Sequence, residues 1–305
     1  MVRLATYNLL HGVPVLGGMV PPELDADGKP AGLTVADDVP LRAAVQALDA
    51  DVIGLQEVDV DQPRSGGLHQ MRAVAEALQA AHWRFAPSVS GTPGVPGWVE
   101  ATDEQERASN PHLDDSTPRR RASDRAPGPH GELAPIGPLY GVGLVSRLPV
   151  LEWRTTRFDA APWSLPLMIP AEPRPQFIKV ADEPRAAIAA VVEGKHGPFT
   201  VATAHLSFVP GYNVRQLREL RRWLAGLPRP LVLLGDFNLP GRVPARVTGW
   251  TPLVRERTYP VMRPRAQLDH VLADGLTPAQ ISSAAATVHP LPVSDHAAVT
   301  VDLDL

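Results

Sequence analysis

Short apolar runs rich in β-branched residues recur along the chain, separated by turn-forming residues. Runs of five to nine residues with this composition predict β-strands. In the last run Val299, Val301 and Leu303 alternate with more polar positions, so one face of that strand is expected to be buried. The predicted strands cover residues 2–8, 51–57, 82–86, 140–146, 185–193, 198–206, 231–236, 267–272 and 297–303.

Three other segments carry apolar residues three and four positions apart, which predicts amphipathic helices. Helices interrupt the early strands, whereas hairpin-like spacing dominates between residues 139 and 206. This order indicates an α/β (α+β) chain with mixed sheets, two of them stacked and the helices outside. The predicted helices cover residues 40–50, 67–82 and 213–227.

Two stretches show neither pattern. Residues 87–138 are rich in Pro, Gly, Ser and mixed charge, so we expect a mobile insertion within a single domain that spans residues 1–305. Residues 14–33 carry Asp25 and Asp27, which are potential calcium ligands. No glutamate closes a 12-residue EF-hand loop around them, and a solvated loop is therefore expected.

The amino-acid composition limits the kinds of catalytic and metal site that the chain can form. The 305 residues are 44% apolar, which suffices for a sizeable core. The absence of cysteine excludes disulfides, thiolate catalysis and Cys-ligated zinc or iron–sulfur sites. Any bound metal must therefore be held by oxygen or imidazole ligands.

Charge and targeting signals add a few expectations. The chain opens directly on a strand pattern and no apolar run approaches 18 residues, so we expect a cytoplasmic monomer without membrane insertion. A formal charge of −4 gives no global attraction to a polyanion. Only three of the 29 basic residues are lysines, however, and arginine suits local phosphate binding.

Polar side chains recur where the predicted strands end. Taken singly, each residue could be a cap, a turn residue or a hydrogen-bonded core group. Jointly they supply oxygen ligands for a divalent cation, an acid to orient water and imidazoles to stabilise phosphate charge. These residues are Asn8, Glu57, His205, Asp236, Asn238, Asp269, Asp295 and His296.

A serine-hydrolase triad is not the expected chemistry. Ser294, Asp295 and His296 are adjacent, and consecutive residues of an extended chain point to opposite sides. They therefore cannot align as nucleophile, base and orienting acid. No GxSxG motif accompanies them.

The motifs QEVD at 56–59, GDFN at 235–238 and SDH at 294–296 occur in this order, together with TYNLLHG, GVGLVSRLPV, TAHL and QLDHVL. This series resembles the endonuclease/exonuclease/phosphatase family over nearly the whole chain. The resemblance implies a DNase I-like four-layer sandwich, in which two mixed β-sheets stack face to face with helices outside. It places the active site at one end of the sandwich.

The resemblance also implies roles for the strand-end residues. Glu57 would bind Mg²⁺ or Mn²⁺ with Asn8 beside it, and Asp295 would be a further metal ligand of lower rank. Asp236 would orient or deprotonate the attacking water, and Asn238 would hold the substrate phosphate.

The remaining roles concern phosphate charge. His296 would contact the phosphate while Asp269 fixes its tautomer. His205 would be a second imidazole that donates to the phosphate or to the leaving oxygen. Arg185 matches a phosphate-facing arginine, with a surface salt bridge as the alternative.

The expected function is hydrolysis of a phosphoester by a metal-assisted, Asp-oriented water. A phosphodiester is favoured, because two imidazoles and one metal suit a substantial leaving group. DNA, RNA, lipid headgroups and small phosphodiesters all stay open as substrates. The alternatives are a non-catalytic binding or scaffold member of the same fold, and a lipid phosphodiesterase that docks on membranes through an apolar loop at 161–170. A proline-rich loop packed on the sandwich is the simpler interpretation of that segment.

Overall fold

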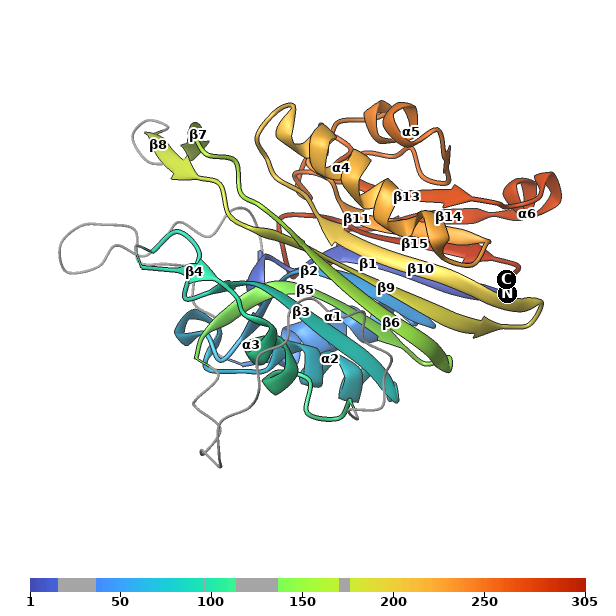
Figure 1. The fold of residues 1–305 in the computed structure, drawn as a ribbon, viewed down its shortest axis with the longest axis horizontal. Coiled ribbons are helices and arrows are strands. Elements are labelled where there is room, and N and C mark those ends of the chain that lie inside the picture. The colour runs from blue at the N-terminus through green and yellow to red at the C-terminus, as the bar shows by residue number, and fades with distance from the viewer. Residues whose placement is uncertain (16–36, 96, 114–136, 170–175) are drawn as a thin grey trace.

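Two mixed β-sheets form the body of the molecule in the computed structural model, which describes residues 1–15, 37–95, 97–113, 137–169 and 176–305 (Figure 1). The first sheet has the order β14 (Ala285–His289), β15 (Ala298–Leu303), β1 (Val2–Asn8), β2 (Val52–Val60), β5 (Leu139–Ser146), β3 (His82–Ser90) and β4 (Val99–Glu100). The second has the order β12 (Thr251–Pro252), β13 (Asp269–Asp274), β11 (Leu231–Asp236), β10 (Gly197–His205), β9 (Arg185–Gly194) and β6 (Val150–Phe158). A separate pair, β7 (Ser164–Ile169) and β8 (Gln176–Ala181), projects from the body.

Helices cover the outer faces of both sheets (Figure 1). Apolar residues of the first helices pack on the first sheet, and Leu217 and Leu220 pack on the second. The helices are α1 (Val39–Leu48), α2 (Gln70–Ala77), α3 (Asp103–Ala108), α4 (Tyr212–Trp223), α5 (Val243–Thr248) and α6 (Pro278–Ser283), and the short 3₁₀ turns are η1 (Leu10–Gly12), η2 (Pro63–Ser65) and η3 (Leu224–Gly226).

The central core lies between the inner faces of the two sheets. Leu4 and Leu144 of the first sheet belong to the same buried cluster as Ile188, Val201 and Leu234 of the second. Removing this apolar surface from water is the main force that holds the sheets together. The result is the four-layer α+β sandwich that the sequence predicted.

The sheets approach closely next to the predicted site. A Cβ atom on Gly54 would collide with Leu234 and Thr203, so glycine permits the contact. Two residues further along β2, Gln56 accepts from the Thr6 hydroxyl at 3.2 Å and donates to Thr203 Oγ1 at 2.9 Å. This buried link joins the two sheets just below the strand ends that carry the polar residues.

All nine predicted strands are present, and the three predicted helices correspond to α1, α2 and α4. Helix α2 is shorter than predicted and begins at Gln70, because Gly66 and Gly67 adopt positive φ angles in the preceding turn. Strands β6 and β14 were not predicted. Both occupy sheet edges and are only partly buried, so their sequences lack a continuous apolar run.

The first part of the expected insertion, residues 87–95 and 97–113, contains segments that pack against the body. Helix α3 begins with a capping box between Thr102 and Gln105. Glu106 forms ion pairs with Arg84 of β3 at 2.8 Å and with Arg157 of β6 at 2.7 Å. Residues 114–136 lie outside the described residues, and mobility of the insertion there stays a prediction. Most of the 14–33 loop, with Asp25 and Asp27, lies outside them as well.

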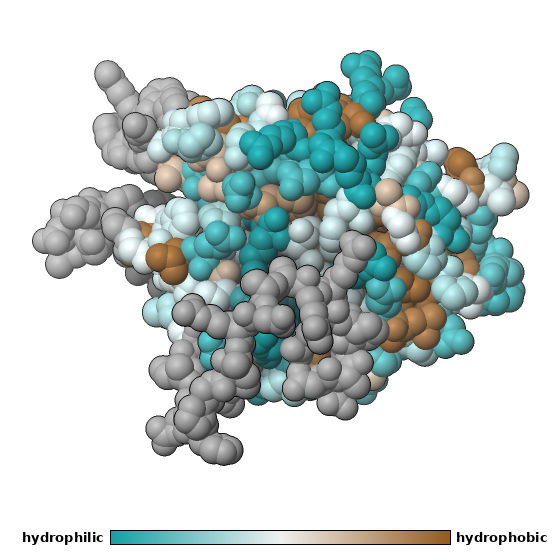
Figure 2. Space-filling view, in the orientation of Figure 1, coloured by the Kyte–Doolittle hydropathy of each residue, from teal (hydrophilic) through white to brown (hydrophobic). Residues whose placement is uncertain are grey.

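The space-filling view shows hydrophilic side chains gathered over α4 on the outer face of the second sheet (Figure 2). Among the described residues, none of the helices has both the length and the apolar character needed to cross a bilayer. Within the 161–170 segment Ala161 is buried, whereas Trp163 is 54% exposed and its ring lies edge-on to Tyr212 of α4 with centroids 6.0 Å apart. The side chains of residues 166–170 are outside the described set.

His270 provides a pH-dependent element of stability outside the site. It faces away from Asp269, stacks on Phe237 with ring centroids 5.5 Å apart, and donates from Nε2 to the Leu239 carbonyl at 2.7 Å. Burial lowers the pKa of His270 to about 4, from an ordinary value near 6.5.

The unfolded chain therefore binds a proton in a pH range where the native protein keeps His270 neutral. We expect the free energy of unfolding to fall by about 3 kcal/mol from this residue as the pH drops from 7 to 4. Urea titrations of the wild type and His270→Gln across that range measure the difference. Equal pH dependence in both proteins would contradict the assignment.

Candidate active site

Polar strand ends from both sheets meet at one end of the sandwich. Strands β1 and β2 are parallel, and Asn8 lies opposite Gln56, next to Glu57. Strands β10 and β11 are also parallel, with His205 opposite Asp236. Because carboxyl ends of parallel neighbours share one edge, four of the predicted site residues come together there.

A β-bulge directs Glu57 into the site. The register between β2 and β5 shifts between Leu55 and Val58, and Glu57 has a φ of 56°. Asn8 Nδ2 donates to Glu57 Oε1 at 2.9 Å and to Asp236 Oδ2 at 3.1 Å. One buried amide thus links a carboxylate of each sheet. The Asn8 side-chain oxygen accepts from the Leu10 amide at 3.0 Å.

Asp236 is held by the backbone that the GDFN motif creates. Gly235 has a φ of 142°, and a Cβ there would collide with the Ala204 carbonyl, which explains the glycine. Asp236 Oδ1 accepts from the Asn238 amide at 2.9 Å, and Asn238 itself has a φ of 49°. Burial raises the pKa of Asp236, and the nearby charge of His296 acts against this rise. A base with a raised pKa suits proton transfer near neutral pH.

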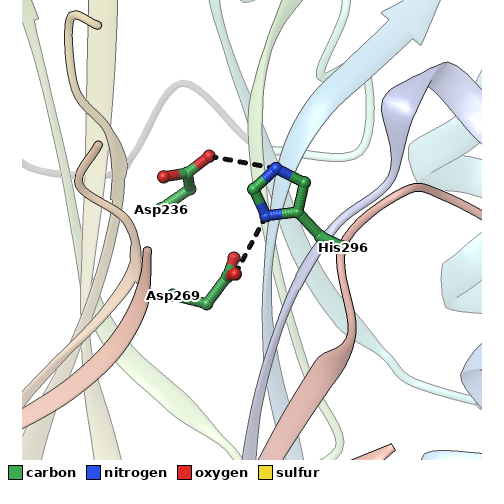
Figure 3. A group of neighbouring side chains, drawn as sticks. All are labelled: Asp236, Asp269 and His296. Carbon is green, nitrogen blue, oxygen red and sulfur yellow. Dashed lines mark hydrogen bonds and ion pairs between the residues drawn. The ribbon is translucent and has the colours of Figure 1, made fainter. Parts of the chain in front are cut away.

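His296 lies between two carboxylates (Figure 3). Its Nδ1 is 2.9 Å from Asp269 Oδ2, and its Nε2 is 3.8 Å from Asp236 Oδ2. Burial alone lowers the pKa of His296, but the charges of Asp269 and Asp236 outweigh it and raise this pKa to about 10. The ring is therefore an imidazolium at neutral pH. The Tyr259 ring packs on it with centroids 4.7 Å apart.

His205 differs from His296 in charge. Burial, followed by the charges of Arg185 and His296, lowers the pKa of His205 well below its ordinary value, so this ring is neutral. Its Nε2 lies 3.6 Å from Asp236 Oδ2 and 3.3 Å from the side-chain nitrogen of Asn238. The two imidazoles flank one carboxylate with different protonation states.

Arg185 lies inside the site and not in a surface salt bridge. It is 4% exposed, its Nη1 is 3.3 Å from His205 Nδ1, and its Nη2 is 3.5 Å from buried Asp182. The buried Nε has no hydrogen-bond partner within the described part of the chain. A guanidinium with unused donors is suited to bind a phosphate.

Asn238 and Asp295 complete the predicted set. The Asn238 side chain is half-buried and donates to the Leu206 carbonyl at 3.0 Å, beside His205. Asp295 is half-buried, and burial raises the pKa of its carboxyl group. Its negative charge in turn acts on Glu57, which shows that the two carboxylates share one electrostatic environment.

Several residues near the site were missed from the sequence. Tyr140 is buried, and Arg64 lies over its ring at 5.6 Å. Burial and the charges of Glu57 and Glu183 raise the pKa of Tyr140 well above its ordinary value. Glu183 precedes Arg185 by two positions, and the two-residue period of an extended chain would have placed both on one side. Tyr140 had no comparable signal.

The donor groups fit a hard divalent cation. Burial raises the pKa of Glu57 and Asp295, so positive charge beside these carboxylates would stabilise them. Oxygen donors of this type suit Mg²⁺ or Mn²⁺. Asp236, Asp269 and His296 also offer ligand atoms within 4.8 Å of one another. We assign the metal to the side of the site that holds Glu57 and Asp295. His296 on the other side is an imidazolium, and an imidazolium cannot bind a metal.

Comparisons with known proteins agree with this architecture. The chain matches the sequence profile of the Endonuclease/Exonuclease/phosphatase family over residues 5–296. No curated protein sequence matches it significantly.

Solved structures share the fold at low sequence identity. An endonuclease/exonuclease/phosphatase from Beutenbergia cavernae is 21% identical with a TM-score of 0.57, and the match covers 100% of this chain and 71% of that one. A family protein from Leptotrichia buccalis is 12% identical with a TM-score of 0.54, and a mannosyl-6-phosphatase from Bacteroides thetaiotaomicron is 15% identical with a TM-score of 0.50, each covering 100% of both chains. The solved structures show the shared fold, and the profile match over residues 5–296 places the chain in the endonuclease/exonuclease/phosphatase family of phosphoester hydrolases.

Proposed function

We propose that this protein is a Mg²⁺- or Mn²⁺-dependent phosphodiesterase. The observation that carries the proposal is the position of Asp236. Its carboxylate is 2% exposed and is surrounded by Asn8, His205 and His296, each with a nitrogen within 3.8 Å. A carboxylate held this way by neighbours from several strands is preorganised to orient a water and to accept its proton.

The other groups divide the remaining tasks. Glu57 would hold the metal, with Asn8 and Asp295 beside it. When bound, the cation supplies charge neutralisation at a phosphate oxygen. Asn8 would have to present its oxygen, which now accepts from the Leu10 amide, so we assign it the weaker metal contact.

Phosphate charge would be balanced by two cations of the chain. His296 faces the site as an imidazolium that Asp269 orients, and Arg185 offers an Nε–H that has no partner among the described residues. Neutral His205, together with Asn238, would donate hydrogen bonds to the phosphate or to the leaving oxygen. The different charges of the two imidazoles support a division between charge stabilisation and hydrogen bonding.

A screen over substrates tests the proposal. Plasmid DNA, RNA, bis-p-nitrophenyl phosphate, sphingomyelin, inositol phosphates and a sugar phosphate would be assayed with Mg²⁺, with Mn²⁺ and with EDTA. The sugar phosphate belongs in the set because one structural neighbour is named as a mannosyl-6-phosphatase. We expect metal-dependent hydrolysis of a diester. Absence of hydrolysis for every compound would favour the scaffold alternative.

Glu57→Gln should weaken metal affinity while keeping the shape of the side chain. The substitution removes an anionic oxygen ligand, and Asn8 can still donate to the amide oxygen. We expect the Mg²⁺ concentration for half-maximal activity to rise at least ~10-fold, with a matching loss of Mn²⁺ binding in calorimetry. An unchanged titration by both methods would remove Glu57 from the metal site. Glu193→Gln, an exposed glutamate on β9, is the matched control.

A further inference from the structure

The segment from residue 237 to residue 266 is strongly basic, although the whole chain has a formal charge of −4. It contains six arginines, no lysine and a single glutamate, Glu256. All six arginines are exposed, and within the described chain their guanidinium groups form neither an ion pair nor a side-chain hydrogen bond. Arg246 lies within α5, whereas the other five lie outside helices and strands. We call these five residues the arginine rim: Arg242, Arg255, Arg257, Arg263 and Arg265.

Backbone and ring contacts hold this segment against the turn that carries Asp295 and His296. The Tyr259 ring packs on His296, and the Val261 amide donates to the Asp295 carbonyl at 2.6 Å. Thr258 Oγ1 accepts from the Asp269 amide at 3.3 Å. Because Arg257 and Arg263 lie within two residues of these anchors, their backbone borders the site.

Two further contacts bring the ends of the segment together. The Thr258 amide donates to the Ala266 carbonyl at 2.9 Å, which joins the backbone next to Arg257 to the backbone next to Arg265. The Gly241 amide donates to the Gln267 carbonyl at 3.2 Å, which joins the backbone next to Arg242 to the end of the same segment. Chain segments that carry Arg242, Arg257 and Arg265 thus meet, although these arginines are distant in sequence.

The charge pattern contrasts with the centre of the site. Glu57, Asp236, Asp269 and Asp295 make the centre acidic, and His296 and Arg185 provide its cations. One phosphate group needs no more than these central residues. Additional guanidinium groups outside the centre fit a ligand that carries further phosphates along a chain, because each can bind one phosphate through two parallel hydrogen bonds.

We propose that the arginine rim binds the phosphodiester backbone of a nucleic-acid strand that continues past the scissile phosphate. The substrate class is then a nucleic acid and not an isolated phosphoester. This inference rests on the proposed hydrolysis at the adjacent site. An anionic membrane is less suited, because Met262 is the only large hydrophobic residue of the described 237–266 segment that is exposed, and membrane docking needs apolar area.

The test removes rim charge and measures binding apart from turnover. Arg257→Gln, Arg263→Gln and Arg265→Gln are combined in one variant, and a fluorescein-labelled 20-nucleotide strand is titrated in EDTA at several salt concentrations. Arg72→Gln with Arg107→Gln is the control, since both arginines are exposed, unpaired among the described residues and located on α2 and α3. A variant with lysine at the three rim positions tests rescue by charge alone.

We expect the glutamine variant to bind the strand at least ~10-fold more weakly at low salt, with the slope of log K against log salt reduced by about 2. The control should match the wild type, the lysine variant should recover most of the binding, and hydrolysis of bis-p-nitrophenyl phosphate should stay unchanged. Wild-type affinity and slope in the glutamine variant would overturn the inference. So would unchanged strand binding together with lost binding to phosphatidylserine vesicles. A wild type that binds the strand but hydrolyses no phosphoester would overturn the proposed activity alone.

Discussion

Asp236→Asn should lower turnover by at least ~10²-fold while the fold and most of the metal affinity persist. The amide has the same size and can still accept from the Asn238 backbone through its oxygen. It cannot take a proton from water, and it supplies no negative charge to orient the nucleophile. Steady-state kinetics at saturating Mg²⁺, with thermal unfolding as the check on folding, measure the effect.

A matched comparison separates catalysis from local structure at this position. Asp274→Asn changes a carboxylate at the opposite end of β13, where the side chain pairs with Arg229 far from the strand ends of the site. Normal turnover in Asp274→Asn and a large loss in Asp236→Asn would support the assignment. Near-normal turnover in Asp236→Asn would make Asp236 a structural cap.

His296→Ala should produce the second large loss, of about 10²- to 10³-fold in kcat, because it removes a cation aimed at the phosphate. His289→Ala provides a control, since His289 is half-buried and hydrogen-bonds to Thr300 outside the site. The lost ring also leaves Asp269 buried without its partner, so the stability of the variant must be measured in parallel.

Combining the two substitutions tests whether these residues act together. Asp236 and His296 are 3.8 Å apart and serve one transition state, so the double variant should lose much less than the product of the single losses. Multiplicative losses in kcat would indicate that the two side chains contribute to separate steps.

The layered fold could be predicted because its central strands are buried on both faces. Strands such as β11 appear as continuous apolar runs, and they end at once in polar residues. The edge strands β6 and β14 pack on one face only. Their mixed apolar and polar composition therefore does not give the continuous apolar run by which a strand is recognised. Helix α3 escaped detection because its buried contacts are ionic, through Glu106, and not an apolar stripe.

The sequence predicts which residues lie in the candidate site better than it predicts their charges and pKa shifts. Strand-end position identified Asn8, Glu57, His205 and Asp236, since parallel neighbours bring their carboxyl ends together. His296 precedes β15, which pairs antiparallel with β1 and therefore starts at the same edge. The contrast between a neutral His205 and a charged ring at 296 depends on which charges surround each imidazole in space. Long-range contacts of this kind leave no local pattern in the sequence.

The arginine rim illustrates the same limit for surface charge. A formal charge of −4 argued against avid binding of a polyanion, yet one segment concentrates arginines beside the site. The net charge is a sum over the whole protein surface, including faces that do not contact the ligand. These arginines have a proposed role because Tyr259 and Val261 hold their segment against the turn that carries Asp295 and His296.

The most direct measurement of the central claim is hydrolysis of a phosphodiester in ¹⁸O-labelled water, with the products analysed by mass spectrometry. A metal-assisted attack by an Asp236-oriented water predicts one ¹⁸O atom in the phosphoryl product, formed with Mg²⁺ and not with EDTA. Label in the alcohol product, or turnover that persists without a divalent metal, would contradict the account.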